Sequence, residues 1–133
     1  MVGWSMLVAS HPMTPAEALR AVCDAWEQGD PDAAANLFAP DGVYEDPLYD
    51  APLRGREPIR AGLSQGMGAI EDCRVTLDPV LQEGERVLAV GYFASKLRDG
   101  GDRFDFPFAI LVELSDAGIE RLAEYFDTKP LVP

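Results

Sequence analysis

Residues 37–47, LFAPDGVYEDP, together with residues 55–59, GREPI, are the stretches of sequence that decide the fold. Pro40-Asp41-Gly42 predicts a turn, and residues 43–46 predict a short strand that ends at the next proline. Residues 47–55 contain two prolines and a glycine, so they predict a loop. A helix is then expected from Glu57 to about Met67.

Two further helices are predicted upstream of this segment. Thr14-Pro15-Ala16-Glu17 combines a capping threonine, a proline suited to the first helical turn and a glutamate that completes a capping box. Apolar residues then recur with helical spacing up to Trp26, and Gly29 ends the helix. Asp30-Pro31 repeats the start signal, which predicts a second short helix with Leu37 and Phe38 at its end.

Downstream, the hydrophobic period changes from that of helices to that of strands. Strands are expected at residues 75–81, 87–97, 104–114 and 119–126, separated by glycine-containing turns. Alternation is strongest in residues 104–114, which therefore present one aromatic and aliphatic face. Helices followed by an antiparallel meander predict an α+β fold in which the helices cover one face of a sheet.

Length and charge limit the possible functions. The 133 residues suit a single domain, expected to span residues 14–133 after a flexible N-terminal extension at residues 1–13. With 23 acidic and 11 basic residues the net charge is −12, which argues against binding nucleic acid or an anionic membrane surface. No apolar run is long enough to span a membrane.

The few histidines and cysteines point away from metal and thiol chemistry. His11 is the only histidine, and Cys23 and Cys73 are the only cysteines. This composition predicts no metal site, no Ser–His–Asp triad and no Cys–His dyad. Unpaired cysteines are expected to be small core residues and to indicate a reducing, cytoplasmic location.

The quoted stretch resembles the ketosteroid isomerase and SnoaL-like branches of the NTF2-like superfamily. The shared pattern is the Phe-Ala strand that ends in Glu45-Asp46-Pro47, followed by the Gly-Arg-Glu start of the next helix, and the likeness extends weakly over the whole chain. The resemblance implies a cone-shaped fold, in which three helices pack on a curved, mostly antiparallel sheet around a deep apolar pocket. It also implies pairing as a homodimer through the outer face of the sheet.

The isomerase resemblance places Asp46 on the general base, which moves a proton between carbons of an enolisable substrate. The isomerases also use a tyrosine and a protonated acid as oxyanion donors; this family is the standard example of a carboxylic acid kept neutral by its site. At those positions the sequence has Val22 and Ile110. The candidate donors that remain are Tyr44, on the same strand face as Asp46, and Glu124.

The chain is also similar in part to limonene-epoxide-hydrolase-like enzymes of the same superfamily. Tyr44-Glu45-Asp46 matches their Tyr-x-Asn with Asp for Asn, and Glu124 falls on their later acid. Gly91 and Phe93 stand where those enzymes have Arg-x-Asp. Cyclases of this fold that open epoxides use a second acid beyond the third helix, which Glu71 or Asp72 could supply here.

The expected function is cofactor-free acid–base catalysis on a small apolar metabolite. Asp46 is the predicted base, Tyr44 a hydrogen-bond donor, and Glu124 or Asp72 the second acid; proton-transfer isomerisation is the first hypothesis. Epoxide hydrolysis, polyketide or polyether cyclisation, and a non-catalytic ligand-binding or dimerisation module are the alternatives. Glu124 itself reads equally well as a pocket acid or as a solvated edge-strand charge. The predicted pocket residues are Val22, Trp26, Phe93, Phe106, Phe108, Ile110, Leu122 and Phe126.

Overall fold

The computed structural model describes residues 12–129, and the first of its helices is α2, Pro15–Gln28. The predicted capping box is confirmed: the Glu17 amide donates to Oγ1 of Thr14 at 3.1 Å, and the Thr14 amide donates to Oε1 of Glu17 at 2.8 Å. Gly29 ends the helix in the left-handed conformation that glycine adopts without strain. Most of the extension predicted at residues 1–13 lies outside the described residues, as do the last four residues of the predicted domain.

Two more helices follow in the described chain, α3 at Pro31–Ala35 and α4 at Arg56–Gly68. Asp30 caps α3 by accepting a hydrogen bond from the Ala33 amide at 3.0 Å. Arg56, from the quoted GREPI stretch, donates from Nε to the Phe38 carbonyl oxygen at 2.8 Å. This bond fastens the start of α4 to the first strand, so the two quoted stretches form one structural unit.

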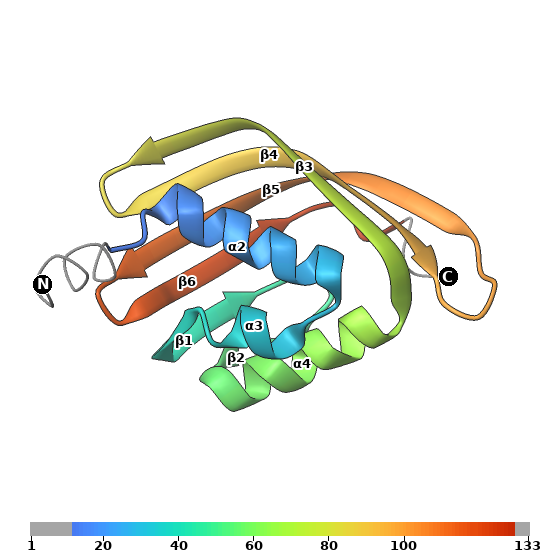
Figure 1. Cartoon of the computed structure of the whole chain (residues 1–133), viewed down its shortest axis with the longest axis horizontal. Coiled ribbons are helices and arrows are strands. Elements are labelled where there is room, and N and C mark those ends of the chain that lie inside the picture. Colours follow the sequence, from blue (N-terminus) through green and yellow to red (C-terminus); the bar gives the residue numbers. More distant parts are fainter. Residues whose placement is uncertain (1–11, 130–133) are drawn as a thin grey trace, which may run out of the picture.

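Six strands of residues 12–129 form one sheet in the order β2-β1-β6-β5-β4-β3. Their bounds are β1 Phe38–Glu45, β2 Leu53–Arg54, β3 Ile70–Glu83, β4 Arg86–Leu97, β5 Arg103–Ser115 and β6 Gly118–Tyr125. Every neighbouring pair is antiparallel except β1 and β6, which run parallel. Figure 1 shows the long strands curving over α2, with α3 and α4 beside the short strands. The predicted α+β fold with a curved, mostly antiparallel sheet is confirmed.

Three local predictions are wrong, and all concern the short strands. Pro40-Asp41-Gly42 was expected to form a turn, but it lies within β1, whose register with β6 shifts between Phe38 and Val43. Phe38 was expected at the end of the second helix, but it begins β1 and is fully buried. The expected loop at residues 47–55 contains β2, which pairs with Val43 and Tyr44. Phe38 is paired with Ile119, far away in the sequence, and local sequence patterns carry no information about such a partner.

The inner face of the sheet and the helices enclose the hydrophobic core. Along β5 every second side chain from Phe104 to Leu114 turns inward, as the alternation predicted. Leu19 of α2 and Ile59 of α4 are fully buried against this face. None of the helices in residues 12–129 combines the length and the apolar character that a membrane crossing requires.

Candidate active site

A cavity of about 280 Å³ lies between α2, the end of α4 and the inner face of strands β3 to β6. Seven of the eight predicted pocket residues line it, namely Val22, Trp26, Phe93, Phe106, Phe108, Ile110 and Phe126. Leu122 is not among the lining residues; its side chain is fully buried in the core. The lining also contains residues that the sequence did not indicate, namely Cys23, Leu48, Gly66, Ala69, Ile70, Val75, Leu97 and Phe104. Of these, Phe104 continues the alternation of β5 and could have been found from it.

Asp46 and Glu124 are the only charged side chains among the described residues that line this cavity. They come from opposite ends of the sequence but from neighbouring strands, because β1 and β6 are parallel and pair Glu45 with Ala123. The carboxyl ends of parallel strands lie at the same edge of a sheet. Asp46 directly follows β1 and Glu124 is near the end of β6, so the topology brings the two acids together.

The hydroxyl group of Tyr44 joins the two acids. It lies 3.0 Å from Oε1 of Glu124, to which it donates, and 3.5 Å from Oδ2 of Asp46. Tyr44 is only 1% exposed, and its ring stacks on Phe38 with 6.2 Å between ring centroids. Since the ring is held on both sides by the core, the hydroxyl is a fixed point between the carboxyl groups. The structure therefore brings together three of the four predicted catalytic residues.

Burial raises the pKa values of Glu124 and Tyr44. The pKa of Glu124 lies well above the ordinary glutamate value, first because burial disfavours its charged form, and then because of the hydrogen bond to Asp46 and the charge of Asp46. The pKa of Tyr44 is also raised well above its usual value, by burial and by the nearby negative charge of Glu124. Burial therefore favours the protonated form of Glu124, and Tyr44 stays protonated.

A short turn orients Asp46. Its Oδ1 accepts a hydrogen bond from the Leu48 amide at 2.8 Å, and its carbonyl oxygen accepts one from the Tyr49 amide at 3.0 Å. The turn-capping role considered for Asp46 is thus present together with its place at the cavity. The Tyr49 hydroxyl donates to the Gly62 carbonyl oxygen at 3.1 Å, which ties the turn to α4. Tyr49 lies in the predicted loop, and no sequence signal indicated its role.

The structure does not bring Asp72 to the cavity, which corrects its selection as a possible second acid. Oδ2 of Asp72 accepts a hydrogen bond from Nη1 of Arg103 at 2.9 Å, and its side chain is 48% exposed. This guanidinium lowers the pKa of Asp72, so the group is an ionised surface carboxylate. Asp72 follows Glu71 in β3, and neither residue lines the cavity. The register of β3 shifts between Glu71 and Arg74, where Asp72 has a φ of 53°, so Asp72 does not share the inward face of Ile70 and Cys73 faces the core instead.

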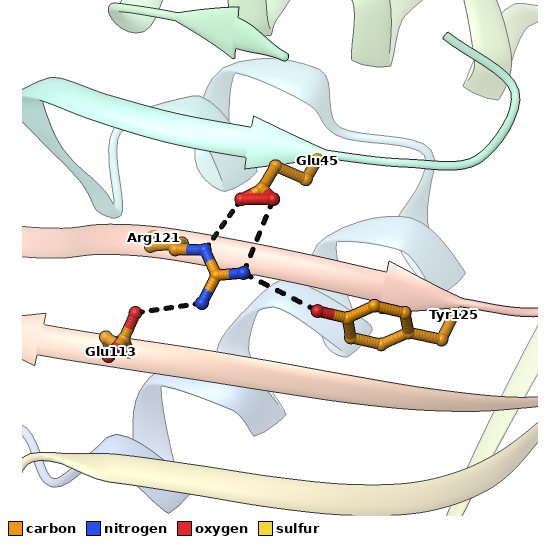
Figure 2. A network of polar contacts seen from close by, with 4 residues as sticks. All are labelled: Glu45, Glu113, Arg121 and Tyr125. Atoms are coloured by element: carbon orange, nitrogen blue, oxygen red, sulfur yellow. Dashed lines mark hydrogen bonds and ion pairs between the residues drawn. The ribbon is translucent and has the colours of Figure 1, made fainter. Parts of the chain in front are cut away.

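On the opposite face of the sheet, carboxylates are paired with an arginine. Figure 2 shows Arg121 donating to Glu45 at 2.6 Å, to Glu113 at 3.2 Å and to the Tyr125 hydroxyl at 3.5 Å. The hydrogen bond from Arg121 lowers the pKa of Glu45. Glu45 is adjacent in sequence to Asp46, yet it lies on the other face and has a cation partner. The cavity acids contact each other and Tyr44, Asp46 also accepts from the Leu48 amide, and neither acid has a cation partner among the described residues.

Few other polar groups face the cavity. Val22 and Ile110, which the resemblance places at the positions of the isomerases' donors, are both buried lining residues. Burial raises the pKa of the Cys23 thiol to about 12, which keeps it protonated. Nε1 of Trp26 is buried without a hydrogen-bond partner in the described structure. Within residues 12–129 no group of three or more His, Cys, Asp or Glu side chains is arranged to hold a metal ion.

The chain matches the model of a known protein family. The model of the SnoaL-like domain matches residues 19–124, so the protein belongs to the SnoaL-like domain family. The fold is that of the NTF2-like and ketosteroid-isomerase-like proteins. A comparison with curated protein sequences gave no significant match.

Solved structures agree with this assignment. A protein with a ketosteroid isomerase-like fold from Catenulispora acidiphila, in complex with trimethylamine, is 27% identical with a TM-score of 0.78, covering 90% of this chain and 91% of that one. A candidate polyketide cyclase from Pseudomonas putida is 20% identical with a TM-score of 0.72 over 90% and 96% of the chains. An epoxide hydrolase of M. tuberculosis, described as LEH-like, is 24% identical with a TM-score of 0.71 over 86% and 83%. The last two likenesses establish the fold alone.

Proposed function

We propose that the protein is an enzyme that catalyses proton transfer on a small, largely apolar metabolite without a cofactor. The observation that carries this proposal is the convergence of Asp46 and Glu124 on the Tyr44 hydroxyl at an otherwise apolar cavity. Two carboxyl groups whose surroundings differ can take the roles of acid and base in one site. In this assignment Asp46 is the base, and Glu124 is the acid.

The assignment of roles follows from the surroundings of each carboxyl group. The raised pKa of Glu124 favours its protonated form, which can donate a hydrogen bond or a proton to a substrate oxygen or nitrogen. Asp46 is held at its Oδ1 by the Leu48 amide, which leaves Oδ2 as the oxygen that accepts a proton. Tyr44 is buried beneath both groups and is a positioning residue, since its hydroxyl fixes Glu124.

Isomerisation is the favoured reaction, since one base beside one neutral acid is what a shift of a proton between carbons requires. Asp46 removes a proton from a carbon next to an electron-accepting group, Glu124 polarises that group, and Asp46 returns the proton to another carbon. Epoxide opening is the second candidate, and the observation that favours it is again the pair of acids on one hydroxyl. There Glu124 would protonate the epoxide oxygen while Asp46 takes the proton of the attacking water or hydroxyl group.

The test is proton exchange on simple probes of the reaction class. Cyclohex-3-enone and other small apolar ketones are incubated with the protein in D₂O, and deuterium incorporation and double-bond migration are followed by ¹H NMR. We expect Asp46→Asn to reduce the catalysed rate by roughly 10²-fold or more. Asp105→Asn, which removes an exposed carboxylate from β5, is the matched control and should leave the rate unchanged. Equal rates for Asp46→Asn and wild type would remove Asp46 from the mechanism.

We also propose that the protein acts as a homodimer that pairs through the outer face of the sheet. Val90 and Tyr92 of β4 and Tyr125 of β6 are 46%, 50% and 54% exposed. The register places Ala109 of β5 beside both Val90 and Tyr125, so the three side chains share one face. Arg121 beside this patch is already paired with glutamates of its own chain, so a second copy can approach without meeting an unpaired charge.

A further inference from the structure

The cavity pairs two carboxyl groups with no cation, although the chain has 11 basic residues. Elsewhere in the described structure, arginines accompany Glu45, Asp72 and Asp24 at 2.6 to 3.1 Å. No Lys, Arg or His is among the described residues that line the cavity. A carboxylate in apolar surroundings without a cation is costly, and that cost falls when a cation binds beside it.

Aromatic rings make up much of the remaining wall. Phe106 lies 4.7 Å from Phe126 and 5.2 Å from Phe93, measured between ring centroids, and Phe93 meets Trp26 edge-on at 5.7 Å. All four rings line the same cavity as the two acids. Aromatic rings attract ammonium ions through the negative potential of their faces, an attraction that grows when water is excluded. The net charge of −12 adds a long-range attraction for cations and repels anions.

We infer that the cavity binds a small lipophilic cation, an amine-derived ammonium or iminium ion, in preference to neutral or anionic molecules of the same shape. This inference deepens the proposed function and rests on it for the roles of Asp46 and Glu124. The ligand supplies the positive charge that the wall lacks. Its apolar part fills the volume bounded by Phe93, Phe106 and Phe126.

A cationic substrate also fits the lack of oxyanion donors at Val22 and Ile110. An enolate formed there would carry the negative charge that Asp46 gives up on accepting the proton, with no hydrogen-bond donor at these two positions, whereas an iminium ion loses a proton to become neutral. In that step the C–H bond next to C=N⁺ breaks and its proton goes to Asp46. The C–H electron pair forms the C=C bond of an enamine, and the C=N π pair returns to nitrogen. Substrate and carboxylate both end uncharged, and no further reactant is needed.

Three probes with one shape and different charge test the binding preference. Benzyltrimethylammonium is the cation, neopentylbenzene its neutral isostere, and phenylmethanesulfonate an anion with a tetrahedral head. Binding is followed by fluorescence of Trp26, which lines the cavity, in protein carrying Trp4→Phe so that one tryptophan remains. We expect the cation to bind about 10-fold or more tightly than the isostere, and the sulfonate not to bind.

Variants then test whether the preference for the cation arises from binding in the cavity. Asp46→Asn should weaken binding of the cation about 10-fold and leave the isostere unaffected, whereas Asp105→Asn should change neither affinity. Equal affinity for cation and isostere, or a cation affinity unaltered by Asp46→Asn, would overturn the inference. This binding result and the ketone assay can fail separately. If the ketone assay shows exchange that depends on Asp46, but the cation does not bind preferentially, the proposed function still stands and only this inference fails. Cation preference without any exchange would contradict the catalytic role instead.

Discussion

The Tyr44 hydroxyl donates a 3.0 Å hydrogen bond to Oε1 of Glu124, a residue 80 positions later in the sequence. The bond crosses from β1 to β6, the one parallel pair of strands in the sheet. It lies where the apolar cavity meets its only charged groups among the described residues. Through this contact the core of the fold fixes the position of the proposed acid relative to Asp46.

Replacing Tyr44 by phenylalanine tests that contact. The hydrogen bond from Tyr44 favours the ionised form of Glu124, so Tyr44→Phe should raise the pKa of Glu124 further. The variant should also lose about 1–3 kcal/mol of unfolding free energy, since a buried acceptor loses its donor. Urea unfolding and ¹³C-carboxyl NMR measure the two effects. Tyr92→Phe, at an exposed tyrosine of β4, is the control and should change neither quantity. A lower pKa of Glu124 in Tyr44→Phe would count against the bond.

Glu124 should make stability depend on pH in an unusual direction. Its pKa is higher in the folded than in the unfolded chain, so the folded state holds the extra proton once the pH passes the ordinary glutamate value. Stability should therefore fall as pH rises above the ordinary glutamate value of about 4.3, by at most about 1.4 kcal/mol per pH unit. Glu124→Gln, which keeps the shape and the hydrogen bonds, should remove this slope. An unchanged slope in urea unfolding curves of the variant would contradict the buried acid.

For Glu45, the dependence of folding stability on pH has the opposite sign. Its folded pKa is lowered by the hydrogen bond from Arg121, so its contribution is present at neutral pH and is lost as pH falls below the ordinary value. The two windows are separate. Measurements above the ordinary glutamate value therefore report on Glu124 and not on the outer-face network of Figure 2.

Gly91 of β4 should not tolerate a side chain. A Cβ at this position would overlap the carbonyl oxygen of Thr76 and crowd Phe108 of the cavity wall at 3.1 Å. Gly91→Ala should cost about 1–3 kcal/mol of unfolding free energy. Gly68→Ala, where no atom lies within 4 Å of the added carbon, is the control and should be neutral or slightly stabilising. Equal melting temperatures for the two variants would contradict the close approach of β3 and β4. The arginine of the epoxide hydrolases could not be introduced here.

The outer face should hold two copies together. Light scattering at micromolar concentration should give twice the mass of one chain, since an interface of about 1,200 Å² or more is expected for a stable pair. Val90→Lys places a charge in the centre of the exposed apolar patch and should yield a single-chain mass. Ala117→Lys, in the exposed turn between β5 and β6, is the charge-matched control. A single-chain mass for wild type would contradict the dimer.

Local patterns predicted most of the fold because the elements that carry them are stabilised locally. The capping box at Thr14 and Glu17 and the alternation of β5 need only neighbouring residues or a half-buried face. The start of β1 at Phe38 and the strand β2 depend on partners remote in the sequence, and they were missed. Parallel pairing in particular leaves no short-range signal, because its two strands are joined by a long connection.

The candidate site, like the fold, could be predicted from the sequence only in part. The apolar neighbours of Glu124 on β6 left open whether it faces the cavity or the solvent, and Asp46 was selected from the resemblance of its strand. Asp72 was misplaced because its acidity says nothing about which face of β3 it occupies, and Arg103 draws it to the surface. The role of Tyr49 depends on a contact with the backbone of α4 that no pattern reveals.

The measurement that tests the acid–base pair most directly is a ¹³C-carboxyl NMR titration of Glu124 in wild type and in Asp46→Asn. The pairing predicts that Glu124 titrates well above the ordinary glutamate value in wild type, because of burial and of the neighbouring Asp46. Removing the negative charge of Asp46 should lower that pKa while burial keeps it above the ordinary value. Titration of wild-type Glu124 near the ordinary value of about 4.3, or a pKa indifferent to Asp46→Asn, would contradict the pairing of the two acids.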